Sequence, residues 1–216
     1  MKVLITGVMF FMVFINGFGQ SGYEKSLNKI PKIRVSLLQS NVSEDSIKNY
    51  LLYTFENTIF PYWVGTTWGY NGHTNVPKKG EIACGYFVST TLKHLGFNWN
   101  RYELAKMYSK QIVEDVCDSV YTFYTKDKLH TFVRYRPDNL YIIGLSGHVG
   151  LVLKYKGLVW FIHSDYYNAR GPVKEMFEQS VALNDSDVFW CGTFLTHSTI
   201  QKWLHKTAYH LKRKTN

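Results

Sequence analysis

The segment 139–166, NLYIIGLSGHVGLVLKYKGLVWFIHSDY, constrains the fold of this chain more than any other. It holds three runs rich in Val, Ile, Leu and aromatic residues, separated by the turn sequences GLSG and YKG. Such runs between turn signals predict strands joined by hairpins. The chain is therefore expected to contain an antiparallel sheet.

The sequence before these strands favours helices. Residues 21–40 predict a loosely ordered lead-in. In 41–60, Asn41 and Glu44 fit a capping box, and apolar residues recur on one face until Pro61 ends the pattern.

Further segments complete the expected order of elements. Residues 100–118 predict a helix, and 119–136 are ambiguous, with many residues that favour strands. We expect a short helix around 173–179, a strand near 188–191 and a final helix near 198–210. Because helices precede an antiparallel sheet, the predicted class is α+β.

A lone cysteine begins another helical pattern. From Cys84 the apolar face continues through Val88, Leu92 and Leu95, and Gly96 supplies a stop. A thiol in the first turn lies near free N–H groups and the positive end of the helix dipole, which lowers its pKa. The alternative is a small buried apolar residue.

The N-terminus predicts export. In residues 1–20, Lys2 precedes the apolar run VLITGVMFFMVFING, and the small and polar FGQS follows, as in a secretory signal peptide. No later stretch is apolar for the roughly 18 residues of a membrane span. We expect an exported, monomeric protein with a lead-in over 21–44 and one domain over 45–216.

The net charge and the loop before Cys84 indicate which classes of partner to expect. The formal net charge of +9 suits an anionic surface such as cell wall. The loop before Cys84 lacks the ending of a phosphate-binding loop, so no nucleotide site is expected, and no nucleic-acid partner is predicted.

Of three cysteines, at least one stays unpaired in an exported chain. A bridge between Cys117 and Cys191 would leave Cys84 free, but sequence does not establish it.

Two histidines share one face of the predicted hairpin. If the turn is centred after Tyr155, His148 lies opposite His163. With a two-residue turn at 156–157, His148 instead faces Asp165, and His163 is its diagonal neighbour. The two histidines could be solvated surface residues, metal ligands, or the base and orienting group of a cysteine nucleophile. No third ligand at familiar zinc spacing is evident.

Four stretches in order resemble one family. These are PYWVGTTWGYNG, ACGYFVSTTLKHLG, RPDNLYII and GHVGLVLKYKGLVWFIHS, within about residues 45–166. They are similar to the NlpC/P60 branch of the papain-like cysteine peptidases, which cut peptide bonds in bacterial cell-wall stem peptides. The resemblance implies a papain-like fold with the nucleophile helix packed on an antiparallel sheet.

The resemblance also implies residue roles. Cys84 matches the nucleophile, His148 the general base, His163 the third polar residue and Tyr62 a tyrosine that helps hold the oxyanion. No metal or cofactor is implied. Substrate contacts are expected from Trp63, Trp68, Gly147, Ser164 and Asp165.

The chain departs from the family pattern near the nucleophile. Ala83 replaces the usual Asp, Gly85 the usual Ser, and Thr66 a second Gly. The long spacing from Cys84 to His148 predicts an insertion over 98–136 that shapes the cleft.

The sequence thus predicts an exported cysteine peptidase or amidase that cleaves peptidoglycan stem peptides. Alternatives are an inert cell-wall peptide-binding module of the same fold, a hydrolase or acyltransferase with another substrate, and a zinc protein.

Overall fold

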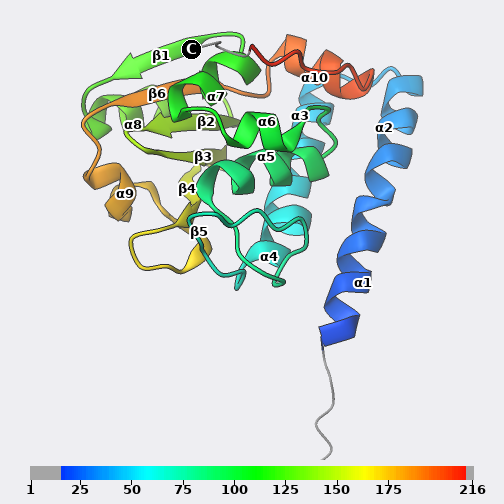
Figure 1. The fold of residues 1–216 in the computed structure, drawn as a ribbon. Helices are drawn as coiled ribbons and strands as arrows, with labels where there is room; N and C mark the ends of the chain where they lie inside the picture. Colours follow the sequence, from blue (N-terminus) through cyan, green and yellow to red (C-terminus); the bar gives the residue numbers. More distant parts are fainter. Residues whose placement is uncertain (1–15, 213–216) are drawn as a thin grey trace, which may run out of the picture.

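The computed structural model describes residues 16–212, and this part of the chain begins with two helices (Figure 1). α1 (Asn16–Leu27) and α2 (Lys29–Gln39) run along one side of the molecule. Tyr23 and Ile30 are buried against the rest of the chain. The predicted loosely ordered lead-in is therefore wrong, because burial of these side chains stabilises helices there. The predicted signal peptide falls mainly on residues outside the described range.

α3 (Glu44–Thr54) begins later than its predicted cap. The Ser43 side chain accepts a hydrogen bond from the Ser46 backbone N–H, so Ser43 and not Asn41 is the N-cap. The helix continues through a π-helical turn into α4 (Phe60–Trp63). Pro61 does not end the helical path, because a helix tolerates proline in its first turn.

The remaining elements are helices and strands. In chain order they are α5 (Cys84–His94), α6 (Arg101–Ala105), α7 (Ser109–Val116), β1 (Val120–Phe123), α8 (Lys126–Arg134), β2 (Asn139–Leu145), β3 (His148–Tyr155), β4 (Leu158–Asp165), β5 (Gly171–Met176), a 3₁₀ turn (Phe177–Gln179), α9 (Val181–Asn184), β6 (Phe189–Thr193) and α10 (His197–Leu204). α5, α6 and α7 follow one another in succession, and so do β2, β3, β4 and β5.

The three strands expected in 139–166 are confirmed as β2, β3 and β4. The helix expected around 173–179 is wrong, because most of that segment is β5, which pairs with β4. The ambiguous segment 119–136 divides into β1 and α8.

The strands form one six-stranded antiparallel sheet in the order β1-β6-β2-β3-β4-β5, which confirms the α+β class. α5 and α7 pack on one face, which carries Leu151 of β3 and Ile162 of β4. α8, α9 and the 3₁₀ turn cover the face that carries Val152 and Phe161. Each face thus has its own apolar core.

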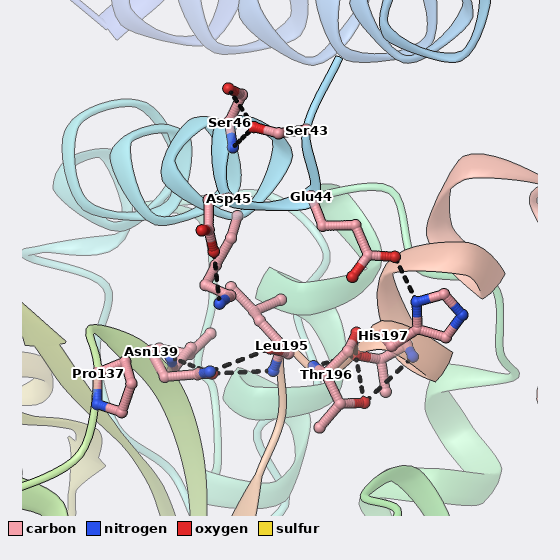
Figure 2. A network of polar contacts seen from close by, with 12 residues as sticks. Ser43, Glu44, Asp45, Ser46, Pro137, Asn139, Leu195, Thr196 and His197 are labelled. Atoms are coloured by element: carbon pink, nitrogen blue, oxygen red, sulfur yellow. Dashed lines mark hydrogen bonds and ion pairs between the residues drawn. The ribbon is translucent and has the colours of Figure 1, made fainter. Parts of the chain in front are cut away.

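Polar contacts join the two ends of the domain where β2 starts (Figure 2). The Asn139 side chain donates to the Leu195 carbonyl at 3.0 Å and accepts from the Leu195 N–H at 2.9 Å. Glu44 at the start of α3 contacts His197 at the start of α10. The first helix of the domain is therefore fixed to the last one.

Candidate functional site

Cys84 is the first residue of α5, and the loop before it is held on the sheet. The Ser164 hydroxyl of β4 donates to the Ile82 carbonyl at 2.7 Å. The Ala83 N–H donates to the Gly72 carbonyl at 2.8 Å, which closes the loop on itself. These contacts fix the backbone on which the thiol stands.

The Cys84 sulfur lies at the point where β3 and β4 separate. Their pairing ends at Leu151 and Ile162, and beyond it the Val149 backbone N–H hydrogen-bonds the sulfur. Burial raises the pKa of the Cys84 thiol, and the N–H groups of Val149, Gly85 and Cys84 itself lower it less. The expected depression of this pKa is wrong, because desolvation outweighs the helix terminus.

Cys84 opens into a cleft of about 490 Å³. Two lining residues, Ala105 and Lys106, come from the predicted insertion, and Trp68 was an expected substrate contact. The cleft is lined by Trp68, Tyr70, Asn71, Ala83, Cys84, Tyr86, Ala105, Lys106 and Tyr166. It therefore combines a thiol, aromatic walls and one cation.

Gly85 lets α6 pack against α5. A Cβ at Gly85 would lie 2.4 Å from the Ala105 carbonyl oxygen, so a serine cannot occupy this position without displacing α6. The departure from the family pattern at Gly85 thus has a steric cause.

The two histidines meet on one face of the sheet, as predicted. Tyr155 pairs with Leu158, so the turn has two residues and His163 is the diagonal neighbour of His148. His148 Nε2 and His163 Nδ1 are 2.9 Å apart, and both side chains are buried. Gly150 makes room for Phe161 and His163, since a Cβ there would lie 2.5 Å from the Phe161 ring and 3.0 Å from the His163 Cβ.

His148 keeps one ring nitrogen without a partner. Its Nδ1 is buried and has no hydrogen-bond partner among the described residues. Tyr166 lies beside it, with ring centroids 5.0 Å apart, and also lines the cleft. Burial first, and then the neighbouring His163, lowers the pKa of His148 to about 3, so the imidazole is neutral.

Glu175 extends this pair on the next strand. His163 Nε2 is 3.2 Å from Glu175 Oε1, and Arg170 Nη2 is 3.0 Å from Glu175 Oε2. Burial alone would raise the pKa of Glu175, but hydrogen bonds from His163 and Ser180 and the charge nearby lower it overall. Glu175 is therefore an ionised carboxylate.

Asp165 fixes the turn that carries Tyr166. It accepts hydrogen bonds from the Tyr167 N–H at 3.0 Å and from Arg170 Nε at 2.5 Å. Burial raises the pKa of Asp165, while its bonds to Arg170 and Asn168 lower it by more. Asp165 thus holds the cleft wall, although a substrate contact was expected.

Several expected site residues lie elsewhere. Tyr62 packs on Tyr23 of α1 with ring centroids 4.8 Å apart, and it does not line the cleft. Trp63 is buried and donates to the Tyr23 hydroxyl at 2.9 Å, so it belongs to the core. Gly147 occupies the turn between β2 and β3 with a positive φ of 79°, and Ser164 holds the loop before Cys84.

Glu175, Tyr166 and Lys106 were missed by sequence reasoning. Glu175 was assigned to a helix, where it has no relation to His163. Reading GPVKEM as a strand paired with β4 places it diagonal to His163 and would have found it.

Three further observations concern metal binding, the remaining cysteines and membrane spans. Within residues 16–212, no group of three or more His, Cys, Asp or Glu side chains is placed to hold a metal ion. Cys117 and Cys191 are free and buried. Over the same residues, no helix is long and apolar enough to cross a membrane.

Comparison of the chain with protein-family models, curated proteins and solved structures gave no match.

Proposed function

We propose that this chain is an exported cysteine hydrolase that cleaves an amide bond in peptidoglycan stem peptides. Cys84 is its nucleophile, His148 its general base and His163 the group that orients the base. One observation carries the proposal: a buried histidine pair at 2.9 Å leaves His148 Nδ1 unpartnered, and the next residue, Val149, bonds a helix-start thiol that opens into a cleft. A base oriented by a third polar group is what a thiol nucleophile needs.

The chemistry proceeds by acyl transfer. As the Cys84 sulfur attacks the substrate carbonyl carbon, His148 Nδ1 takes the thiol proton and then gives it to the leaving amine. Water then attacks the thioester, returns one proton to the sulfur through His148, and releases the acid. The N–H groups of Cys84 and Gly85, which bond the resting sulfur at the start of α5, become available to the developing oxyanion as the sulfur attacks.

The resting geometry is compatible with this role. α5 packs on the sheet face opposite to the two histidines, and the thiol reaches their end of β3 next to Val149. In free enzymes the bond between nucleophile and base is often long and tightens with substrate.

The lining of the cleft and the charge of the chain support the choice of substrate. The walls formed by Trp68, Tyr86 and Tyr166 suit a flat or apolar chain, and Lys106 suits an anionic one. The net charge of +9 favours an anionic polymer. The family resemblance and the signal-peptide pattern favour the stem peptides of the cell wall.

The test is mass analysis of purified muropeptides after incubation with the protein and its variants. Cys84→Ala should lower turnover by about 10⁴-fold or more, and His148→Ala nearly as much, because the pair acts as a unit. His163→Ala should be milder and His163→Asn milder still, since asparagine can accept the bond from His148. Cys117→Ala, which removes a buried thiol away from the cleft, should keep wild-type turnover.

Two outcomes contradict the proposal. If folded Cys84→Ala keeps wild-type turnover, Cys84 is not the nucleophile. If the wild type binds muropeptides tightly in calorimetry but cuts none of them, the chain is a binding module and not an enzyme.

A further inference from the structure

The geometry points to Glu175 as a positioning residue that sets the tautomers of both histidines and so leaves His148 Nδ1 free to act as a base. This inference rests on the proposed roles of Cys84 and His148. It goes beyond them because it adds a fourth group, on β5, behind His163.

The ring nitrogen that carries each proton follows from which groups can donate a hydrogen bond and which can only accept one. An ionised carboxylate only accepts hydrogen bonds, so at 3.2 Å from Glu175 Oε1 the His163 Nε2 must carry the proton. When Nε2 carries the only proton of the ring, His163 keeps a lone pair on Nδ1. That lone pair accepts the Nε2–H of His148 across 2.9 Å. His148 consequently carries its lone pair on Nδ1, which is the base.

The reverse order is unfavourable at both ends. If His163 Nδ1 donated to His148 Nε2, a neutral His163 would direct a lone pair at the Glu175 carboxylate. His148 would then hold its proton on Nδ1, which is buried and unpartnered. A buried N–H without an acceptor is unfavourable, because it loses the hydrogen bond that it made to water. Glu175 and His163 therefore determine which ring nitrogen of His148 carries the proton, and no proton needs to pass between these groups.

Arg170 makes the effect of Glu175→Gln predictable. Arg170 Nη2 is 3.0 Å from Glu175 Oε2, and a guanidinium only donates. In the glutamine variant the amide oxygen faces Arg170, so the amide NH₂ faces His163 Nε2. This NH₂ donates, which moves the His163 proton to Nδ1 and the His148 proton to its own Nδ1. The base is then blocked.

The experiment reads the tautomers directly. In the full chain labelled with ¹⁵N-histidine, proton–nitrogen correlation spectra should show wild-type His148 and His163 both protonated on Nε2. Glu175→Gln should move both protons to Nδ1. On muropeptides, this variant should lose about 10²- to 10⁴-fold in kcat with KM nearly unchanged, since an inverted tautomer removes the base and not the binding.

A second pair in this chain supplies the matched control. His130 Nε2 lies 3.1 Å from Glu178 Oε1, away from the cleft lining. Glu178→Gln makes the same chemical change at a histidine and should leave the tautomers of His148 and His163, and kcat, unchanged. Glu175→Asp keeps a group that only accepts, so it should keep both wild-type tautomers and covers the case in which the glutamine variant is unfolded.

The two proposals fail separately. A wild-type His148 with its proton on Nδ1, or folded Glu175→Gln with wild-type tautomers, overturns the role of Glu175 whether or not muropeptides are cut. Wild-type protein that shows the expected tautomers but cuts no muropeptide supports the positioning role and contradicts the proposed function.

Discussion

Cys84 is a protonated thiol and His148 a neutral imidazole in the resting protein at neutral pH. Burial raises the pKa of Cys84 above its ordinary value of 9.0 and lowers that of His148 to about 3. The charged thiolate–imidazolium pair is therefore the less stable form. Under the proposed function, the thiolate forms only as the substrate reacts.

This state predicts how alkylation of Cys84 depends on pH. Because the thiolate is the reactive form and the thiol pKa is raised, the rate with iodoacetamide should keep rising through pH 9 and show no plateau between pH 5 and 8. Peptide mass analysis of the labelled site measures it. Cys84→Ala gives the background from the two buried cysteines. A plateau at or below pH 7 would reveal a resting ion pair instead.

At the scale of elements, the start of α5 carries two residues with opposite steric freedom. Gly85 lies under the Ala105 carbonyl, where a Cβ would be only 2.4 Å from the oxygen. Ala83 is the N-cap, and its side chain makes no capping hydrogen bond. The two positions should therefore respond in opposite directions when a polar side chain is introduced.

Gly85→Ser should lower the free energy of unfolding by about 1–3 kcal/mol, because overpacking displaces α6. Ala83→Asp should raise it by about 0.5–2 kcal/mol, because a carboxylate there accepts from the Gly85 or Tyr86 N–H and faces the positive helix end. Urea denaturation of each variant beside wild type measures both. A stable Gly85→Ser would show that α6 does not press on α5.

The histidine pair was predictable because strand side chains alternate with period two, so either hairpin register put both on one face. Glu175 was not, since its relation to His163 exists only once β5 pairs with β4. The contacts of Tyr62 and Trp63 with Tyr23 were not predictable for a similar reason. Their direction is set by Tyr23 of α1, and residues 21–40 were not recognised as helical.

At the scale of the whole molecule, Tyr23 attaches α1 to α4 and α5. Its hydroxyl accepts from Trp63 Nε1 at 2.9 Å and lies 2.8 Å from His94 Nδ1 at the end of α5. The helix that begins at Cys84 is thus held at its far end by the N-terminal helix.

Tyr23→Phe should reduce stability by about 1–3 kcal/mol, because the buried Trp63 N–H loses its acceptor while the ring packing remains. Tyr53→Phe removes an exposed hydroxyl and should change stability by less than about 0.5 kcal/mol. Thermal unfolding followed by circular dichroism compares them. Equal midpoints for the two variants would mean that α1 contributes little through this contact.

The row of contacting side chains His148, His163 and Glu175 ends on β5, which is one of the two outer strands of the sheet. An outer strand exposes unpaired backbone groups and can recruit a strand from another molecule, which leads to aggregation. β5 carries Pro172, Lys174 and Glu175, and proline and charge are the features that discourage such pairing. β5, which carries Glu175, is thereby protected against the addition of a strand from another molecule. The polar side chains on it can therefore lie at the edge of the sheet without promoting aggregation.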